Sequence, residues 1–282
     1  MLRGLYTATS GMLCQEAATQ TLANNLANVN TAGFKKDNVI YRDFPSMLLR
    51  RINDPTKKIY ENRVDPWPYV GKLGTGTIVD EIYNDRTQGD FHESGNTTDL
   101  ALNGKGFFVV DTPNGVAYTR NGTFKIGAGG RICTLEGFPL LARKSPTNMS
   151  DQDAVINEKG EYPIDVSEIK VEENTKQFTV GEDGKVFIDG EERFRLLVVD
   201  FENTNRVLKR GKDLFFATEG SGMGLFQGQT RVYQGKLENS NVSAVESMVR
   251  LITAQRSYEA NQKVIQNEDQ SLNKLINEVG RA

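Results

Sequence analysis

The sequence predicts an α+β fold, in which long N- and C-terminal helices form a coiled-coil-like pair and the centre is a mainly antiparallel β domain. Two observations lead to this expectation. Near both ends of the 282-residue chain, apolar residues recur at every third and fourth position, which is the period of an amphipathic helix. Between the ends, short β-branched and aromatic runs alternate with glycine-containing turns, as in antiparallel sheets.

Residues 3 to 30 are expected to form the first helix. The polar Gln15 and Thr19 interrupt its apolar stripe, and Ser10 and Gly11 lower its helix propensity. Such a helix is marginal alone and needs packing to form. Gly33 is expected to end this segment, because glycine readily adopts a positive φ. The positions at 3-4 spacing are Leu5, Ala8, Met12, Gln15, Thr19, Leu22, Leu26 and Val29.

Residues 34 to 88 are expected to form an extended linking segment with little core of its own. Within it, Asp43 to Arg51 fits a short helix, and Ile78 to Tyr83 alternates as a strand does. Gly74 to Gly76 is too short for a phosphate-binding loop, and no Lys-Ser/Thr follows it, so a turn is preferred.

Residues 89 to 238 predict the central β domain, either an antiparallel sheet or a partial barrel. Residues 99–102 and 106–111 are expected to pair across a glycine turn. Turn signals stand at 113–115, 120–122 and 182–184. Residues 149–161 are interpreted as a loop or insertion. Further strands are expected at Phe124–Ile126, Arg131–Thr134, Phe178–Val180, Val186–Ile188 and Phe194–Phe201.

The longest expected helix covers residues 239 to 279. Asn239, Ser240 and Asn241 are N-cap candidates, and Gly280 is a stop signal. The helix can pack on its own domain or against other helices. Its length, well above the mean of about 11–12 residues, favours other helices, in this chain or in neighbouring copies. The stripe consists of Leu251, Ala254, Tyr258, Asn261, Ile265, Glu268, Leu272, Leu275 and Val279.

Composition argues against several classes of function. The net charge of −3 comes without a basic block, so we expect no nucleic-acid partner. No apolar run reaches the ~18 residues of a membrane span, and the N-terminus lacks the features of a cleaved secretory signal. Cys14 and Cys133 are expected to be free thiols. We predict no catalytic residue, metal or cofactor, and hence no enzyme, because His92 is the single histidine and no nucleophile–base arrangement stands out.

Several motifs spread over the chain together resemble those of the bacterial flagellar rod and hook proteins. The N-terminal motifs are Gly4-Leu-Tyr-Thr-Ala-x-Ser-Gly-Met and Asn24-Asn-Leu-Ala-Asn-Val-Asn-Thr-Ala-Gly-Phe-Lys35. The central ones are Thr87-Gln-Gly89, Asp99-Leu-Ala-Leu-x-Gly-x-Gly-Phe-Phe108 and Tyr118-Thr-Arg-Asn-Gly-x-Phe124. The C-terminal ones are Gly235-x-Leu-Glu-x-Ser-Asn-Val242 and Leu251-Ile-x-Ala-Gln-Arg-Ser-Tyr-Glu-Ala-Asn-Gln-Lys-Val-Ile265. The length between Gly33 and Thr87 resembles the rod members rather than the hook subunit. The segment Lys35–Tyr83 and the middle of the chain resemble rod proteins of spirochaete type, which are often classed with the proximal rod, while the last helix resembles the distal rod protein as well. The resemblance therefore leans toward the proximal rod paralogue, with the distal one close behind.

The resemblance implies a structural subunit of the basal-body rod, exported through the flagellar type III apparatus without signal cleavage. It would polymerise helically into the periplasmic drive shaft that transmits torque to the hook. Its partners would be copies of itself, other rod and hook-basal-body subunits and the export apparatus. Residues 1–33 plus 239–282 would form an inner tube, residues 34–88 would link, and residues 89–238 would lie outside.

The predicted assembly interface follows the two helical stripes. Its residues are Leu5, Met12, Leu22, Leu26, Leu251, Tyr258, Ile265, Leu272 and Leu275. The alternative is a binding or adhesin-like module, with the β domain on a helical stalk. That alternative predicts a closed oligomer of fixed size, whereas the rod subunit predicts an open filament.

Overall fold

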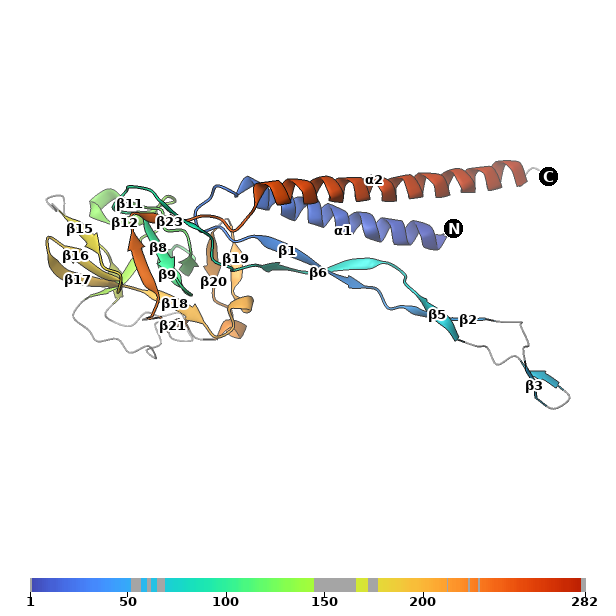
Figure 1. Cartoon of the computed structure of the whole chain (residues 1–282), viewed down its shortest axis with the longest axis horizontal. Coiled ribbons are helices and arrows are strands. Elements are labelled where there is room, and N and C mark those ends of the chain that lie inside the picture. The colour runs from blue at the N-terminus through green and yellow to red at the C-terminus, as the bar shows by residue number, and fades with distance from the viewer. Residues whose placement is uncertain are drawn as a thin grey trace. The chain divides into compact units, whose positions relative to one another are not determined.

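The computed structural model describes residues 2–51, 57–59, 62–64, 69–144, 166–171, 177–211, 213–222, 224–227 and 229–279. The insertion expected at residues 149–161 lies outside these residues. The chain separates into two compact units, and Figure 1 labels many of their elements. The helical unit comprises Met1–Asn24, Asp37–Tyr83 and Val245–Ala282, and the β unit comprises Asn25–Lys36 and Asn84–Ala244.

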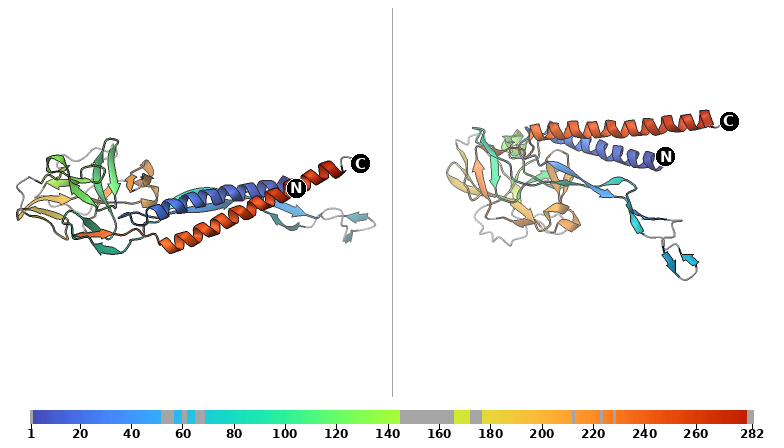
Figure 2. Two further views of the ribbon diagram at one scale, coloured as in Figure 1. Left: turned by 90° about the horizontal axis from the view of Figure 1, so that it is seen from above. Right: turned by 45° about the vertical axis from the view of Figure 1, so that its right-hand side comes forward.

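Both terminal helices of the α+β prediction are confirmed. Helix α1 spans Leu2–Ala27, and α2 spans Ala244–Lys274 and ends in a π-helical turn at Leu275–Val279. The two helices run antiparallel, because Gly4 of α1 faces Glu268 of α2 while Gly11 faces Asn261. The views in Figure 2 show them side by side. Their coiled-coil pairing stays a prediction.

In its described residues, the linking segment forms three successive two-stranded pairs. Strand β1 (Asp37–Asp43) pairs with β6 (Thr77–Asn84), which confirms the strand expected at residues 78–83. Beyond them lie β2 (Met47–Arg50) with β5 (Tyr69–Leu73), and β3 (Lys57–Ile59) with β4 (Asn62–Val64). The first pair lies against α1, where Thr77 N donates to Ser10 Oγ at 3.3 Å.

The prediction of a short helix between Asp43 and Arg51 is wrong. This stretch contains β2, in which Met47 faces Leu73 of β5 and Leu49 faces Gly71. Pro45 favours extended backbone at the residue before it, Phe44, rather than the helical conformation. The backbone groups of residues 47–50 are instead paired with β5, so a partner outside the local window decides the conformation.

The β unit confirms the central antiparallel β domain. One sheet has six strands in the order β19-β20-β10-β9-β18-β21, and a second has five in the order β14-β13-β17-β16-β15. Strands β22-β8, β23-β7 and β11-β12 form separate pairs. The strands are β7 (Phe91–Glu93), β8 (Leu100–Asn103), β9 (Phe107–Thr112), β10 (Gly115–Thr119), β11 (Phe124–Ile126), β12 (Ile132–Thr134), β13 (Leu141–Lys144), β14 (Val166–Glu168), β15 (Phe178–Val180), β16 (Lys185–Ile188), β17 (Glu191–Leu196), β18 (Val198–Phe201), β19 (Leu208–Arg210), β20 (Leu214–Phe216), β21 (Gly224–Phe226), β22 (Arg231–Gln234) and β23 (Lys236–Glu238).

Strand β9 is buried on both faces and joins two apolar clusters. Phe108 and Val110 belong to one cluster, together with residues of the five-stranded sheet such as Val186. Phe107 and Val109 point to the opposite side and pack in the second cluster, which includes Phe215. This division follows from the period of two along a strand, and among the residues that the structure describes both apolar clusters lie in the β unit.

Two strand predictions in the β unit are wrong: one names the wrong pairing partner, and the other joins two strands into one. Residues 99–102 and 106–111 do not pair with each other: β8 pairs with β22, and β9 pairs with β10 and β18. The expected strand Phe194–Phe201 is divided between β17 and β18, which lie in different sheets. An apolar run indicates that a segment is buried, but the strand with which it pairs depends on residues far away in the sequence. The hairpin turns expected at 113–115 and 182–184 are confirmed.

Helix α2 begins at Ala244, five residues later than expected, and the three N-cap candidates lie outside it. Asn241 has a different role in the β unit. Its Oδ1 accepts from Lys36 N at 2.8 Å, and its Nδ2 donates to Asp85 O at 2.9 Å. A side chain engaged with two distant backbone groups is not available to cap the helix.

Candidate functional site

The nine predicted assembly residues do not form a buried interface within one subunit. On α1, Leu5, Met12, Leu22 and Leu26 are half-buried. On α2, Leu251, Ile265 and Leu272 are half-buried, whereas Tyr258 and Leu275 are exposed. Leu22 lines a groove of about 340 Å³ in the helical unit, together with Ala18, Ala254 and residues of β1. The surrounding apolar surface therefore stays partly open to solvent.

Small and polar residues mediate the contact between α1 and α2. A Cβ added to Gly4 would lie 2.9 Å from Glu268 Oε1, and one added to Gly11 would lie 2.9 Å from Asn261 Nδ2. One heptad further along, Ala18 and Ala254 are both buried. Among the 31 residues of α2, the buried ones are Ser247 and Ala254. The long helix thus uses a narrow face of small and polar residues inside the subunit, and its larger side chains are not buried.

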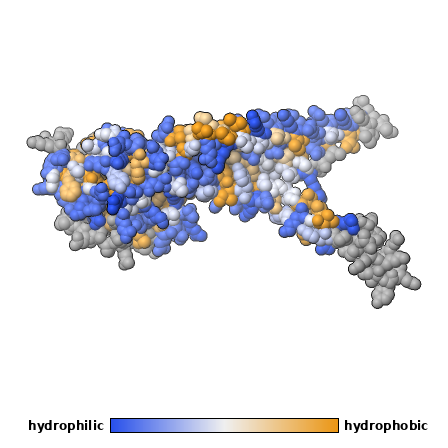
Figure 3. Space-filling view, viewed as in Figure 1, coloured by the Kyte–Doolittle hydropathy of each residue, from blue (hydrophilic) through white to orange (hydrophobic). Residues whose placement is uncertain are grey.

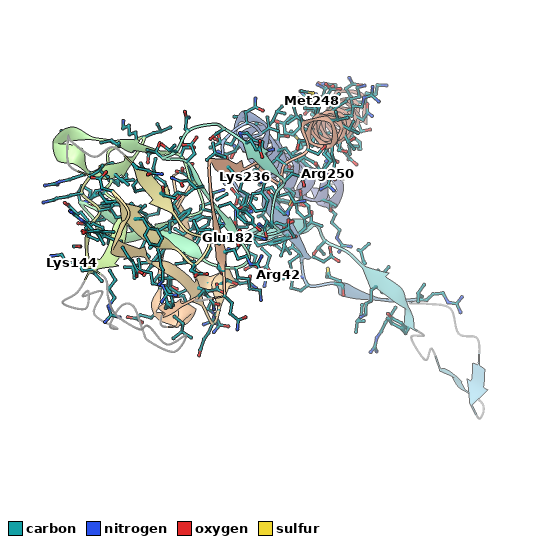
Figure 4. The ribbon with its side chains drawn as sticks, turned by 60° about the vertical axis from the view of Figure 1, so that its left-hand side comes forward. Arg42, Lys144, Glu182, Lys236, Met248 and Arg250 are labelled. Carbon is teal, nitrogen blue, oxygen red and sulfur yellow. The ribbon has the colours of Figure 1, made fainter. Side chains whose placement is uncertain are left out.

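An exposed apolar patch covers the first turns of α2. It consists of Val245, Met248, Val249 and Ile252, whose exposed fractions are 73%, 49%, 58% and 50%. Figure 3 shows it as an orange area, and Figure 4 marks Met248 and Arg250 on the same helix. The sequence reasoning missed this patch because it followed the stripe that begins at Leu251. The 3-4 spacing of residues 245, 248, 249 and 252 was the available signal.

A cavity of about 660 Å³ opens near the other end of the helix pair. Its walls come from α1, α2 and the β2–β5 pair. Several apolar side chains that line it remain exposed, among them Tyr6 at 69% and Val264 at 44%. The lining residues are Arg3, Gly4, Tyr6, Thr7, Ala8, Met47, Leu73, Gly74, Thr75, Asn261 and Val264.

The β unit contains a buried ionic cluster formed by Lys35, Arg120 and Glu238. Their side chains are only 3%, 6% and 1% exposed. Glu238 forms an ion pair with Lys35 Nζ and accepts from Arg120 Nε at 2.8 Å and from Gly89 N at 3.0 Å. Lys35 Nζ also donates to Thr87 O at 2.8 Å. The three charged residues come from segments far apart in the sequence, and their ion pairs connect these segments.

Arg120 also determines how the chain leaves β8. Its guanidinium donates to the backbone carbonyls of Leu102, Gly104 and Gly106. Leu102 lies in β8, whereas Gly104 and Gly106 lie in the link between β8 and β9. This link therefore folds around the arginine instead of making a tight hairpin turn. Gly104 and Gly106 both have a φ of 122°, a value that other residues rarely adopt.

Opposing effects act on the pKa of Glu238. Burial raises it, because a charged carboxylate loses its hydration. The charges of Arg120 and Lys35 and their hydrogen bonds outweigh burial, so the pKa lies below its usual range. The carboxylate is therefore the stable form of this side chain in the folded protein, as its two cationic partners require.

The sequence reasoning missed all three charges as functional residues. Each stands inside a quoted motif: Lys35 ends the second one, Arg120 follows Tyr118-Thr, and Glu238 follows Gly235-x-Leu. A charged residue inside a motif rich in apolar residues and glycine was the available signal, since a buried charge needs a partner.

The described parts of the chain offer no group of three or more His, Cys, Asp or Glu side chains placed to hold a metal ion. Among the helices that the structure describes, none is long and apolar enough to cross a membrane. Cys14 and Cys133 are free and buried.

Three regions of the chain match known families. Residues 5–35 match the family described as flagella basal body rod protein. Residues 101–188 match the D1 domain of the flagellar hook protein FlgE/F/G, and residues 233–278 match the C-terminal region of the flagellar basal body rod FlgEFG proteins. Each matched region supplies one member of the ionic cluster, so the cluster joins all three.

Curated relatives extend the similarity over the whole chain. The flagellar basal-body rod protein FlgG of Borreliella burgdorferi is 33% identical over 96% of this chain and 97% of its own length. FlgG of Buchnera aphidicola subsp. Baizongia pistaciae is 32% identical over 98% and 99%. The flagellar hook-basal body complex protein FlhO of Bacillus subtilis is 33% identical over 100% of both chains.

These similarities do not favour the alternative of a binding module on a helical stalk, because the matched families are structural components of one assembly. They cover the helical ends and the β unit together. The chain belongs to the flagellar basal-body rod protein family, and it is a structural subunit of the rod in the flagellar basal body.

Proposed function

We propose that copies of this chain polymerise helically into the drive shaft that transmits torque to the hook. In this proposal, residues 1–33 and 239–282 build an inner tube, residues 89–238 lie outside it, and residues 34–88 brace the two. The observation that supports the proposal is the unburied apolar surface of α2, in which only Ser247 and Ala254 of 31 residues are buried. Burial of apolar surface between subunits would stabilise the polymer by about 25 cal/mol for each Å² removed from water.

The nine residues of the predicted interface are proposed to meet between subunits. Leu251, Ile265 and Leu272 are half-buried in one copy, and a neighbouring helix at coiled-coil spacing would complete their burial. The same holds for Leu5, Met12 and Leu22 on α1. Since many subunits contribute such stripes, the ordering of the helices is stabilised by assembly.

The proposed partners are copies of this chain and other rod and hook-basal-body subunits. The chain is proposed to have no enzymatic activity, nucleic-acid partner or membrane insertion. It is proposed to reach the periplasm through the flagellar type III apparatus, without signal cleavage. The weak packing of its helical ends suits export, because little tertiary structure opposes threading. The leaning toward the proximal over the distal paralogue stays a prediction.

An Ile265→Asp chain tests the proposed interface. A carboxylate in the buried stripe would lose its hydration without gaining a partner. We expect no filaments at concentrations at which the unchanged chain forms them, with the circular dichroism of the β unit unaltered. Sedimentation and electron microscopy measure assembly. The matched control is Gln266→Asp, which places the same charge at an exposed neighbouring position. Normal filaments from Ile265→Asp would exclude this stripe from the interface.

A further inference from the structure

The helical unit carries two complementary surfaces, an apolar patch and a cavity, at different positions along α2. We infer that the apolar patch at residues 245–252 of one copy docks into the 660 Å³ cavity of a second copy of this chain. This inference rests on the proposed function, because it names the contact that would repeat along the polymer.

The patch has the shape of a docking ridge. Val245, Met248, Val249 and Ile252 occupy one side of α2 over two turns, and all remain about half or more exposed. Clustered exposed apolar side chains of this kind mark sites of protein contact. Methionine suits such a contact because its flexible side chain fills irregular apolar space.

The cavity offers apolar walls that the subunit itself does not cover. Tyr6, Met47 and Val264 line it and are 69%, 50% and 44% exposed. They come from α1, β2 and α2, so the walls are held by three elements of one unit. A ridge of valine, methionine and isoleucine side chains is the chemical match for such walls.

Charges beside the two surfaces are complementary and fix the orientation. Glu246 and Arg250 flank the patch and form an ion pair at 2.6 Å, with both side chains more than half exposed. At the cavity, Arg3 is exposed, and Glu268 Oε1 lies beside Gly4. When the patch enters the cavity, Glu246 can face Arg3 while Arg250 faces Glu268. Such complementarity favours one register over others.

The separation of the two surfaces explains why the contact would repeat. Val249 and Val264 are fifteen residues apart on α2, which corresponds to about 20 Å along the helix. With parallel helices, each contact therefore moves the next copy along the helix axis. A contact between two different surfaces that includes such a translation does not close into a ring, and it generates an open helical filament.

Disulfide trapping in the full chain tests the contact. One sample carries Met248→Cys and another carries Val264→Cys, and the two are mixed under assembling conditions with mild oxidation. Both native thiols are buried, so the unchanged chain gives the background. The matched control mixes Gln255→Cys with Val264→Cys. Residue 255 lies on the same side of α2 as residue 248, about 10 Å further along the helix. The proposed contact places residue 248 at Val264 of the second copy, so residue 255 is displaced from it by more than the ~7 Å Cα separation that a disulfide spans.

The inference predicts a cross-linked dimer in the first mixture, several-fold above the control mixture and above either variant alone. Filaments that form with no excess of this dimer would overturn the docking contact and leave the proposed function standing. A disulfide of Val264→Cys with itself would also overturn it, since that indicates a symmetric contact. If none of the chains, the unchanged one included, forms filaments or cross-links, both the contact and the proposed function fail.

Discussion

Glu238 is the residue on which the β unit depends most. It is 1% exposed, and it forms ion pairs with two buried cations that come from positions 118 and 203 residues away in the chain. Removal of one partner from a buried ion pair leaves the other charge without compensation. The cluster therefore holds together three segments that have no continuous β pairing with one another.

Glu238→Gln should strongly destabilise the β unit. The amide retains the size of the side chain but removes the charge that faces Lys35 and Arg120, at an expected cost of about 3–5 kcal/mol. Urea unfolding followed by circular dichroism measures the loss. The control is Glu93→Gln, because Glu93 is 83% exposed and pairs with Lys236 at 3.7 Å, so it should change stability by less than about 1 kcal/mol. Equal small effects would contradict a structural role of the cluster.

The same carboxylate predicts acid sensitivity. In the unfolded chain a glutamate has a pKa of about 4.3, whereas in the folded protein Arg120 and Lys35 lower the pKa of Glu238. The unfolded state therefore binds more protons in this range, so the stabilisation is present above pH ~4.3 and is lost as the pH falls through the folded pKa. The stability difference between the unchanged chain and Glu238→Gln should shrink from pH 7 to pH 3. A constant difference in the urea midpoints would show that ionisation is not the cause.

At the level of elements, the connection after α1 depends on a close backbone approach. Gly33 has a φ of 67°, its N–H donates to Glu238 O at 2.7 Å, and a Cβ there would lie 2.4 Å from Arg120 O. The sequence predicted Gly33 only as the end of a helix. The structure adds that a larger residue would displace the backbone that presents Arg120.

Gly33→Ala should therefore destabilise the β unit by more than the strain of its positive φ alone. Gly95 provides the matched control, because its φ of 76° is similar and a Cβ there meets nothing within 4 Å. We expect Gly33→Ala to destabilise the β unit by about 1–3 kcal/mol more than Gly95→Ala, the usual range for overpacking. Equal urea midpoints for the two variants would argue against the close approach.

Local pattern predicted much of the fold and little of the long-range organisation. The helices, the hairpin between β9 and β10 and the strand at residues 78–83 follow from periodicity and turn residues close together in sequence. The partners of β8 and the division between β17 and β18 depend on distant strands. The ionic cluster and the contact between Gly11 and Asn261 combine residues from opposite parts of the chain, which single-segment patterns do not record.

For the whole molecule, the distribution of core differs between the two units. In the part of the chain that the structure describes, the two apolar clusters lie in the β unit, whereas α2 buries only Ser247 and Ala254. Opening free energy falls where few apolar contacts are buried. The helical ends are therefore expected to open easily in a single subunit and to become protected in the polymer, where their stripes and the patch at residues 245–252 are covered.

Limited proteolysis of the full chain, dilute and assembled, with fragments identified by mass, tests this central claim most directly. In the dilute sample we expect rapid cleavage within α1 and α2 and survival of a fragment near residues 90–235. In the assembled sample the same helical sites should be protected. Equal protection of the helices in both samples would contradict the claim, because the terminal helices would then be fully packed within one molecule and would gain nothing from assembly.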